Sequence, residues 1–390
     1  MTAVQTGLDR IASDDSDAVR LIRGRKVGLL GHAASVDCKL RAASVVLADV
    51  GAKVSALFGP EHGFAGAAQD MVGVGSSISQ IPMYSLYGGG PEDLSPRPEW
   101  LDGLDVVVID LQDVGSRYYT YVWTAALMLK AAASVGIEVV VLDRPNPLGG
   151  VRVEGAPQRD GYLSFVGLYP VPVRHGLTIA ELLSRVANRE NIPRDALRVI
   201  PMRGWQRSMT WSQTGLPWVM PSPNMPTWDT ALVYPGGCLV EGTKLSEGRG
   251  TTRPFEIWGG PDLDVANLLA LDLHGATLRP VEFTPTFHKH AGQSCKGVQV
   301  HVNDPWVFRP YEAYQRMLAA VLQSVPTKAR WRTETYEFVS DRPAIDLLTG
   351  GPEFRTAIDQ GASLDDGLAL EARGAAQFDD DRRASWLYEK

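Results

Sequence analysis

Short apolar runs alternate with helix-like stretches through the first half of the sequence. The stretch 34–50 is rich in Ala, Leu and Val, and 120–135 is rich in Ala and stops at Gly136, a natural helix end. A further helix is expected over 178–189, followed by a strand near 197–202. The apolar runs are KVGLLG (26–31), KVSALFG (53–59), DVVVID (105–110) and EVVVLD (138–143). Continuous apolar strands that alternate with helices predict an α/β fold, a parallel sheet with helices on both faces.

The pattern changes in the second half. Residues 201–254 are dense in Trp, Pro, Gly and Met, and they form long loops around one expected helix over 227–240. Beyond them the sequence predicts a helix over 262–271, strands over 277–284 and 297–302, and a helix over 311–325. We therefore expect two domains, residues 1–255 with the parallel sheet and residues 256–390 as a smaller α+β domain.

Charge and composition narrow the class of partner. The formal net charge is -7, which argues against a nucleic-acid-binding surface. No apolar stretch approaches the roughly 20 residues that cross a bilayer, and the first 26 residues lack the apolar core of a secretory signal. The three cysteines, Cys38, Cys238 and Cys295, have no CxxC spacing and are expected to be reduced. We expect a cytoplasmic protein with no nucleic-acid or membrane partner, and its oligomeric state stays open.

Unusual polar residues follow the carboxyl ends of the expected strands. The segments are GPEHGF (59–64), LQDVGSRYYTY (111–121), RPNPLGG (144–150) and, shortly afterwards, VEG (153–155). Ligands of parallel sheets bind beyond these ends, because the loops converge there. The sequence therefore predicts an active site at this edge.

Two carboxylates are the candidate catalytic residues. Glu61 comes directly after a buried strand, where a half-buried carboxyl suits a general acid; the alternative is a Glu that caps a helix. Glu154 in the VEG segment is the candidate second carboxylate, since glycoside hydrolysis usually employs two. An exposed Glu before a Gly is also common on protein surfaces.

Other residues are candidates for substrate binding. Aromatic rings stack on sugar faces, whereas carboxylates, amides and guanidinium groups bind hydroxyl and carboxylate groups. A side chain of any of these types can instead have a structural role, and a lone His beside a helix usually has one. The candidates are His62, Asp110, Gln112, Asp113, Arg117, Tyr118, Tyr119, Arg144, Asn146, Arg174, His175, Asn224, Glu241, Glu247 and Arg249.

Cofactor motifs are missing from the sequence. It contains neither GxxxxGK[ST] nor a GxGxxG after the first strand, and no HExxH or comparable metal spacing. We expect no cofactor and no metal. A metal site built from Glu61, His62, His175 and Asp110 stays open as the alternative.

Eight motifs in a fixed order resemble the exo-β-N-acetylmuramidase (NamZ-like) family of peptidoglycan-processing glycoside hydrolases. They are GPEHGF, DLQDVGSRYYTY, DRPNPLGG, VEG, FVGLYPVPVRHGLT, GLPWVMPSPNMPT, DTALVYPGGCLVEGT and SEGRGTTRPFE. The resemblance implies a Rossmann-like catalytic domain, an ancillary C-terminal domain and a cleft between them. It also implies release of N-acetylmuramic acid from the non-reducing end of muropeptide-derived saccharides in cell-wall recycling. Glu61 matches the catalytic glutamate proposed for the family.

The substrate chemistry directs attention to the arginines. N-acetylmuramic acid carries a lactyl carboxylate, for which a bidentate guanidinium is the natural partner. Arg117 is the first candidate and Arg174 the second, with Arg144 and Arg249 behind them. A retaining, inverting or substrate-assisted mechanism stays open. The competing functions are a metal-dependent hydrolase on the same scaffold and a non-catalytic protein that binds cell-wall saccharides.

Overall fold

The core of the protein is a six-stranded sheet with the order β3-β2-β1-β4-β5-β6. The computed structural model describes residues 3–64 and 81–389. Every neighbouring pair of strands in this sheet runs parallel, which confirms the predicted parallel sheet. The strands are β1 (Lys26–Gly31), β2 (Lys53–Gly59), β3 (Met83–Ser85), β4 (Val106–Asp110), β5 (Glu138–Leu142) and β6 (Leu197–Ile200).

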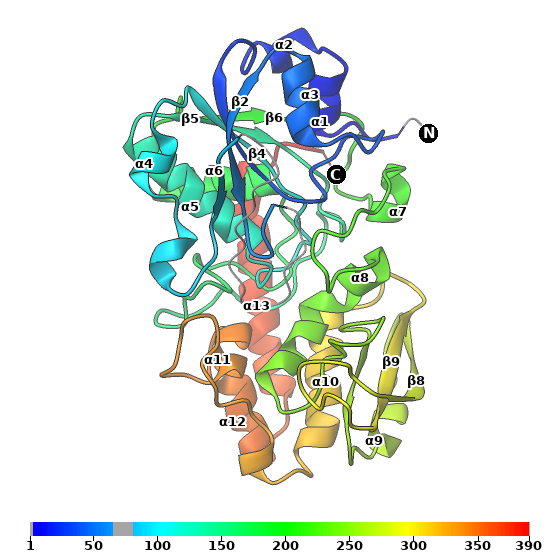
Figure 1. Ribbon diagram of the computed structural model, residues 1–390. Helices are drawn as coiled ribbons and strands as arrows, with labels where there is room; N and C mark the ends of the chain where they lie inside the picture. The colour runs from blue at the N-terminus through cyan, green and yellow to red at the C-terminus, as the bar shows by residue number, and fades with distance from the viewer. Residues whose placement is uncertain (1–2, 65–80, 390) are drawn as a thin grey trace.

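Helices cover both faces of the sheet (Figure 1). Along β4, Val106 and Val108 pack with one group of helices, whereas Val107 and Ile109 pack with the other. This alternation buries both faces, which is why the strand is apolar at every position before Asp110. The first group is α1 (Gly7–Ala12), α2 (Ser16–Val19) and α3 (Ala43–Asp49), and the second is α5 (Tyr121–Ser134) and α6 (Ile179–Arg189).

The second half of the chain builds a smaller α+β part around an antiparallel sheet, as expected. Its strand order is β7-β9-β8, and the rings of Trp258 in β7 and Tyr314 in α10 lie 6.2 Å apart. The strands are β7 (Ile257–Gly260), β8 (Ala276–Phe283) and β9 (Cys295–Val302). The helices of this half are α8 (Trp228–Gly237), α9 (Ala266–Leu269), α10 (Pro310–Leu322), α11 (Ala344–Thr349) and α12 (Glu353–Gln360). A domain boundary at residue 255 stays a prediction.

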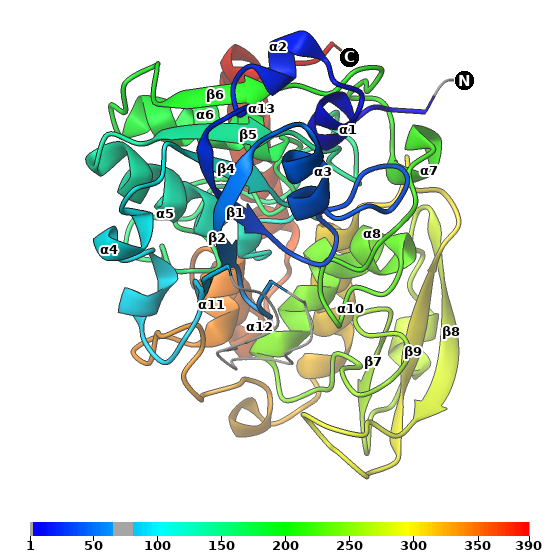
Figure 2. The ribbon, with the colours of Figure 1, turned by 45° about the horizontal axis from the view of Figure 1, so that its top comes forward.

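The long helix α13 (Asp365–Arg382) ties the two parts together, and the sequence patterns did not predict it. Figure 1 shows it running from the smaller part towards the six-stranded sheet, and Figure 2 shows it behind that sheet. At its C-terminal end, Arg382 is fully buried and donates hydrogen bonds to the carbonyl groups of Gly150 (2.8 Å) and Gly176. Nearer its N-terminus, Glu371 accepts one from the hydroxyl of Tyr311 in α10 at 3.0 Å.

Two expected helices are shorter than predicted because aspartates form turns ahead of them. Asp37 Oδ1 accepts a hydrogen bond from the backbone of Arg41, and Leu40 has a φ of 62°. The helix expected over 34–50 therefore begins at Ala43. Asp264 accepts a hydrogen bond from the backbone of Ala266 at 2.9 Å, and α9 starts there.

The remaining short elements lie in connections. The helix expected over 227–240 ends at Gly237, after an internal Pro235, and continues as the 3-10 helix η2 (Cys238–Gly242). The others are η1 (Pro91–Leu94), α4 (Pro98–Leu101), α7 (Trp211–Thr214), η3 (Thr327–Ala329) and η4 (Arg383–Ser385).

Candidate active site

Glu61 lies just beyond the carboxyl end of β2, after Pro60. Its side chain is 13% exposed, and Oε2 accepts a hydrogen bond from the hydroxyl of Thr120 at 2.8 Å. Thr120 is the N-cap residue of α5, so the Glu61 carboxyl group lies beside the start of that helix. The fold thus fixes the carboxyl group while leaving it in contact with a cavity, as proton transfer to a substrate requires.

This cavity, which we call the Glu61 cavity, is lined by both parts of the molecule. Its volume is about 690 Å³ when the open mouth is included. It brings together part of the predicted set: Glu61, His62, Tyr118, Tyr119, Asn224, Glu241 and Arg249. The other lining residues are Thr120, Val166, Ser222, Met225, Tyr234, Phe255, His288, Arg332, Tyr336 and Glu337.

Backbone strain gathers at the same cavity. Four lining residues other than glycine have positive φ: His62 at 70°, Phe255 at 64°, His288 at 69° and Glu337 at 46°. Such conformations cost on the order of 1 kcal/mol or more each, and they accumulate at binding and catalytic sites. The strain is independent of any argument from charge, and it supports this cavity as the functional site.

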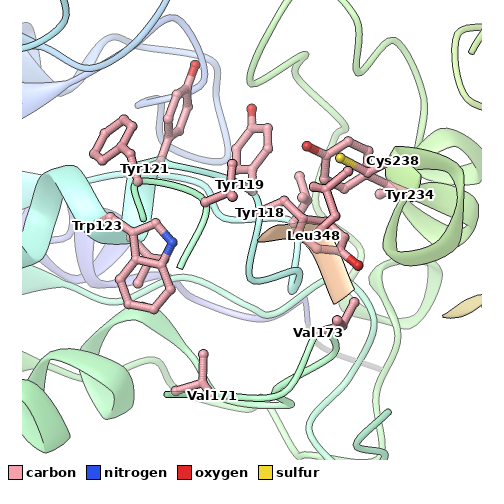
Figure 3. Close-up of a cluster of buried hydrophobic side chains, with 14 of the residues drawn as sticks. Tyr118, Tyr119, Tyr121, Trp123, Val171, Val173, Tyr234, Cys238 and Leu348 are labelled. Carbon is pink, nitrogen blue, oxygen red and sulfur yellow. The ribbon is translucent and has the colours of Figure 1, made fainter. Parts of the chain in front are cut away.

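The buried tyrosines Tyr118, Tyr119 and Tyr234 line the Glu61 cavity. Figure 3 shows these three side chains within a cluster of buried hydrophobic residues. The Tyr119 ring lies 4.6 Å from that of Tyr121 and 6.0 Å from that of Tyr234, measured between centroids. The hydroxyl of Tyr118 donates a hydrogen bond to the carbonyl of Pro235 at 3.3 Å. Burial raises the pKa of Tyr118, Tyr119 and Tyr234, so all three are neutral around pH 7. They offer rings and hydroxyl groups to a ligand rather than charge.

A network of charges fixes the segment from Glu241 to Arg249. Arg249 donates to Glu241 Oε1 from Nη2 (2.7 Å) and Nε (3.2 Å), and its Nε lies 3.5 Å from Glu247. Glu247 also pairs with His288 at 2.9 Å and Lys289 at 3.0 Å. Burial alone would raise the pKa of Glu247, but the charges of Lys289 and Arg249 and the hydrogen bond from His288 outweigh it and hold the pKa below its usual range. Glu247 contacts Arg249 but does not itself line the Glu61 cavity.

The segment 332–337 completes the cavity from the C-terminal half. The Tyr336 hydroxyl donates to Glu241 Oε2 at 2.8 Å, and the Arg332 guanidinium lies over the Tyr336 ring, 5.1 Å from its centroid. Glu337 accepts a hydrogen bond from the hydroxyl of Tyr87 at 3.2 Å. Two segments far apart in sequence therefore form one connected network around the opening.

Several predicted site residues beside the ends of β1 and β4 fix the loops that follow these strands and do not line the Glu61 cavity. Arg144 binds both carboxylate oxygens of Asp110, at 2.6 and 2.8 Å, and both residues are buried. Burial raises the pKa of Asp110, although Arg144 opposes the shift. Burial also lowers the pKa of His32 to about 3; its Nε2 accepts from the backbone of Gln112 at 2.9 Å, while Nδ1 donates to the carbonyl of Pro221. This neutral histidine, which the sequence patterns did not single out, joins the sheet edge to the loop beside the cavity.

Three further predicted residues serve the same structural purpose. His175 Nε2 lies 3.5 Å from Asp113 Oδ2, and Asp113 also accepts from the backbone of Gly115 at 2.8 Å. Asn146 donates to the carbonyl of Leu177 at 3.0 Å. All three side chains are buried outside the Glu61 cavity. They order the loops between the sheet and α6.

Glu154 does not line the Glu61 cavity, so the two predicted carboxyl groups lie in different cavities. Glu154 pairs with Arg174 at 2.9 Å and accepts from the backbone of Tyr311 at 3.1 Å. It lines a different cavity, of about 900 Å³ with its mouth, between the 151–155 loop, the start of α10 and α13. Because both side chains of the pair are buried, Arg174 is bound to a protein carboxylate rather than presented to a ligand.

Arg117 also differs from the prediction. Its side chain is fully buried, and it donates hydrogen bonds to the carbonyl groups of Ala156 (3.2 Å), Val171 (3.0 Å) and Leu348. Figure 3 shows Val171 and Leu348 within the apolar cluster that surrounds this region. The guanidinium satisfies backbone groups in the core and does not reach the Glu61 cavity.

The sequence patterns missed several residues that line the cavity. Tyr234 lies on a helix whose apolar residues read as plain core, and Ser222 lies in a loop with no periodicity. Arg332, Tyr336 and their neighbours come from an irregular segment after α10, where no strand end marks a site. Thr120 alone had a signal, because it follows the tyrosines directly at the start of an expected helix.

The described part of the chain contains no group of three or more His, Cys, Asp or Glu residues arranged to hold a metal ion. His175 faces Asp113, and Asp110 is bound by Arg144, so neither joins His62 in a ligand set. Over residues 3–64 and 81–389, none of the helices has the length and apolar character needed to span a membrane.

Comparison with known proteins identifies the family. The sequence model of the exo-beta-N-acetylmuramidase NamZ N-terminal region matches residues 27–229, and that of the C-terminal region matches residues 232–388. The chain is 40% identical to peptidoglycan beta-N-acetylmuramidase NamZ of Bacillus subtilis (strain 168), over 99% of this chain and 91% of that protein.

Solved structures agree with this assignment. Two crystal structures of DUF1343 family proteins from Bacteroides fragilis NCTC 9343 superpose over the full length of both chains. Their TM-scores are 0.87 and 0.74, at 30% and 26% identity. The sequence, the fold and the cavity around Glu61 thus converge, and the chain belongs to the exo-β-N-acetylmuramidase NamZ family of glycosidases.

Proposed function

We propose that this chain hydrolyses the glycosidic bond of β-linked N-acetylmuramic acid at the non-reducing end of peptidoglycan fragments. The observation that carries the proposal is the position of the Glu61 carboxyl group. It accepts a hydrogen bond from Thr120 and contacts a cavity that is lined by tyrosines and by residues with strained backbone conformations. The relative from Bacillus subtilis is named a peptidoglycan beta-N-acetylmuramidase. A cytoplasmic location stays a prediction.

Glu61 is the proposed general acid. In glycoside hydrolysis one carboxyl group protonates the leaving oxygen while positive charge develops on the sugar. The proton passes from Glu61 to the glycosidic oxygen as the bond to the anomeric carbon breaks.

Glu241 is the carboxylate that we propose to stabilise the developing positive charge, in place of Glu154. It accepts hydrogen bonds from Arg249 at 2.7 Å and Tyr336 at 2.8 Å, and these contacts fix the position of its carboxyl group. A fixed carboxylate beside the anomeric carbon lowers the energy of an oxocarbenium-like transition state. Water or the 2-acetamido oxygen of the substrate completes the displacement at the anomeric carbon.

The experiment is product analysis of a synthetic muramyl–glucosaminyl disaccharide and a longer alternating oligosaccharide, by mass spectrometry. Free N-acetylmuramic acid should appear first from the non-reducing end of both. Release of larger fragments from the middle of the oligosaccharide would contradict an exo-acting enzyme. Tight binding of the disaccharide without any product would instead favour the saccharide-binding alternative.

A further inference from the structure

Among the described residues, Arg249 and Arg332 are the arginines that line the Glu61 cavity, and they differ in their partners. Arg249 is bound to Glu241 and lies 3.5 Å from Glu247. Arg332 is half-buried; it lies over the Tyr336 ring, donates to the carbonyl of Thr335 at 3.3 Å and interacts through its charge with the exposed Glu334. Among the residues that the structure describes, Arg332 forms no ion pair with a carboxylate.

The backbone around Arg332 holds it in place. Its N–H donates to the carbonyl of Gly242 at 3.0 Å, and the preceding Trp331 pairs with Thr243 in an isolated β-bridge. The Tyr336 ring beneath the guanidinium is fixed through its own hydroxyl by Glu241. A guanidinium positioned in this way loses little conformational freedom when it binds a ligand.

We propose that Arg332 binds the lactyl carboxylate of N-acetylmuramic acid and thereby selects this sugar over N-acetylglucosamine. The inference rests on the proposed function and names the residue that sets its specificity. One guanidinium N–H donates to the carbonyl of Thr335, and the other N–H groups can form hydrogen bonds to a substrate carboxylate.

The other charges at the cavity point to the same position. Glu241 and Glu337 line it as well, and both would repel a substrate carboxylate placed beside them. A carboxylate taken out of water without a partner is costly, so the bound sugar must place its lactyl group against a cation. Since Arg249 is committed to Glu241, Arg332 is that cation.

The test compares kcat/KM for Arg332→Ala, Arg332→Lys and the wild-type enzyme on three chromogenic sugars. These are a β-N-acetylmuramide, the same muramide with its lactyl carboxyl group capped as an amide, and a β-N-acetylglucosaminide. Arg342→Ala is the matched control, because Arg342 lies over the Tyr162 ring at 5.2 Å outside the cavity. A melting curve accompanies each variant.

We expect Arg332→Ala to lower kcat/KM for the charged muramide ten- to hundredfold, the range of a charge-assisted hydrogen bond. Activity on the amide and the glucosaminide should change much less, Arg332→Lys should retain part of the preference, and Arg342→Ala should match the wild type. Equal losses on all three sugars, or an undiminished preference for the charged one, would overturn the inference.

The control substrates keep the inference testable if Arg332→Ala does not fold. A wild-type enzyme that cleaves the acid and the amide equally well would overturn recognition of the charge. A wild-type enzyme that releases nothing from any muramide would instead overturn the proposed function, which is a separate outcome.

Discussion

Replacing Glu154 tests whether this residue stabilises the fold or takes part in catalysis, because the two roles predict different effects on the free energy of unfolding and on kcat. Its carboxylate lies between Arg174, at 2.9 Å, and the backbone N–H of Tyr311 at the start of α10, at 3.1 Å. The side chains of Glu154 and Arg174 are 6% and 5% exposed. Arg174 also donates to the carbonyl of Leu148 at 2.8 Å, so the pair joins the loops of the first half to α10.

The expected loss of stability follows from this burial. Glu154→Ala leaves the Arg174 guanidinium buried without its counter-charge, which costs about 3–5 kcal/mol. Glu154→Gln retains an oxygen that accepts from Arg174 and Tyr311, so its cost should be smaller, about 1–3 kcal/mol. Removing both charged partners should cost less than the sum of the single changes, because no unpaired charge is left behind.

Denaturant unfolding of Glu154→Ala, Glu154→Gln, Arg174→Ala and the double alanine variant measures these differences. Assays of kcat well below each melting temperature should give values within a few-fold of the wild type. The reasoning is refuted if Glu154→Gln unfolds like the wild type but loses a hundredfold or more in kcat. That result would return Glu154 to the mechanism as the second carboxylate.

Three further outcomes are expected. Arg117→Ala should lower the melting temperature strongly, because buried carbonyl groups such as that of Val171 lose their hydrogen-bond donor. The ratio of activities on the muramide and the glucosaminide should stay constant. A changed ratio in a variant of unchanged stability would contradict the structural role of Arg117. Burial raises the pKa of Asp143 from 3.8 to about 6. The protonated carboxyl group therefore contributes fully to the free energy of unfolding below about pH 4, and this contribution is lost as the pH rises through 6. The change in the free energy of unfolding is at most ~3 kcal/mol. The melting temperature of Asp143→Asn relative to the wild type should therefore rise from pH 4 to 7, and a flat or falling difference would count against the shift. Prolonged treatment with a chelator should leave activity unchanged, whereas a loss that zinc or magnesium restores would favour the metal-dependent hydrolase.

The sheet was predictable because its strands are buried on both faces. Val106 to Ile109 are apolar at every position, and a run of this kind between two helical patterns is typical of a strand buried on both faces of a parallel sheet. The position of Glu61 was predictable for the same reason, since it follows a strand end directly. Patterns at strand ends also selected Asp110 and Asn146, which order the loops instead of lining the cavity. Sequence position alone does not distinguish a polar side chain that faces a cavity from one that satisfies a neighbouring loop.

The other side of the site could not be predicted in this way. Arg332, Tyr336 and Glu337 come from an irregular segment, and only the packing of the C-terminal half against the first brings them to Glu61. Glu154 looked catalytic because a carboxylate before a glycine is conspicuous in sequence. The backbone N–H of Tyr311 in α10, which donates to the Glu154 carboxyl group, lies 157 residues further along the chain.

The role of Glu61 as general acid is tested most directly by the leaving-group dependence of Glu61→Gln. Exposed Glu99→Gln is the matched control, and melting curves should show that both variants are folded. On the muramyl–glucosaminyl disaccharide, whose leaving oxygen needs a proton, Glu61→Gln should lower kcat by at least about a hundredfold. On a dinitrophenyl muramide, whose leaving group departs without protonation, the loss of bond-breaking rate should be much smaller. Near-wild-type turnover of the disaccharide, or an equal loss on both substrates, would contradict the assignment of Glu61 as the general acid.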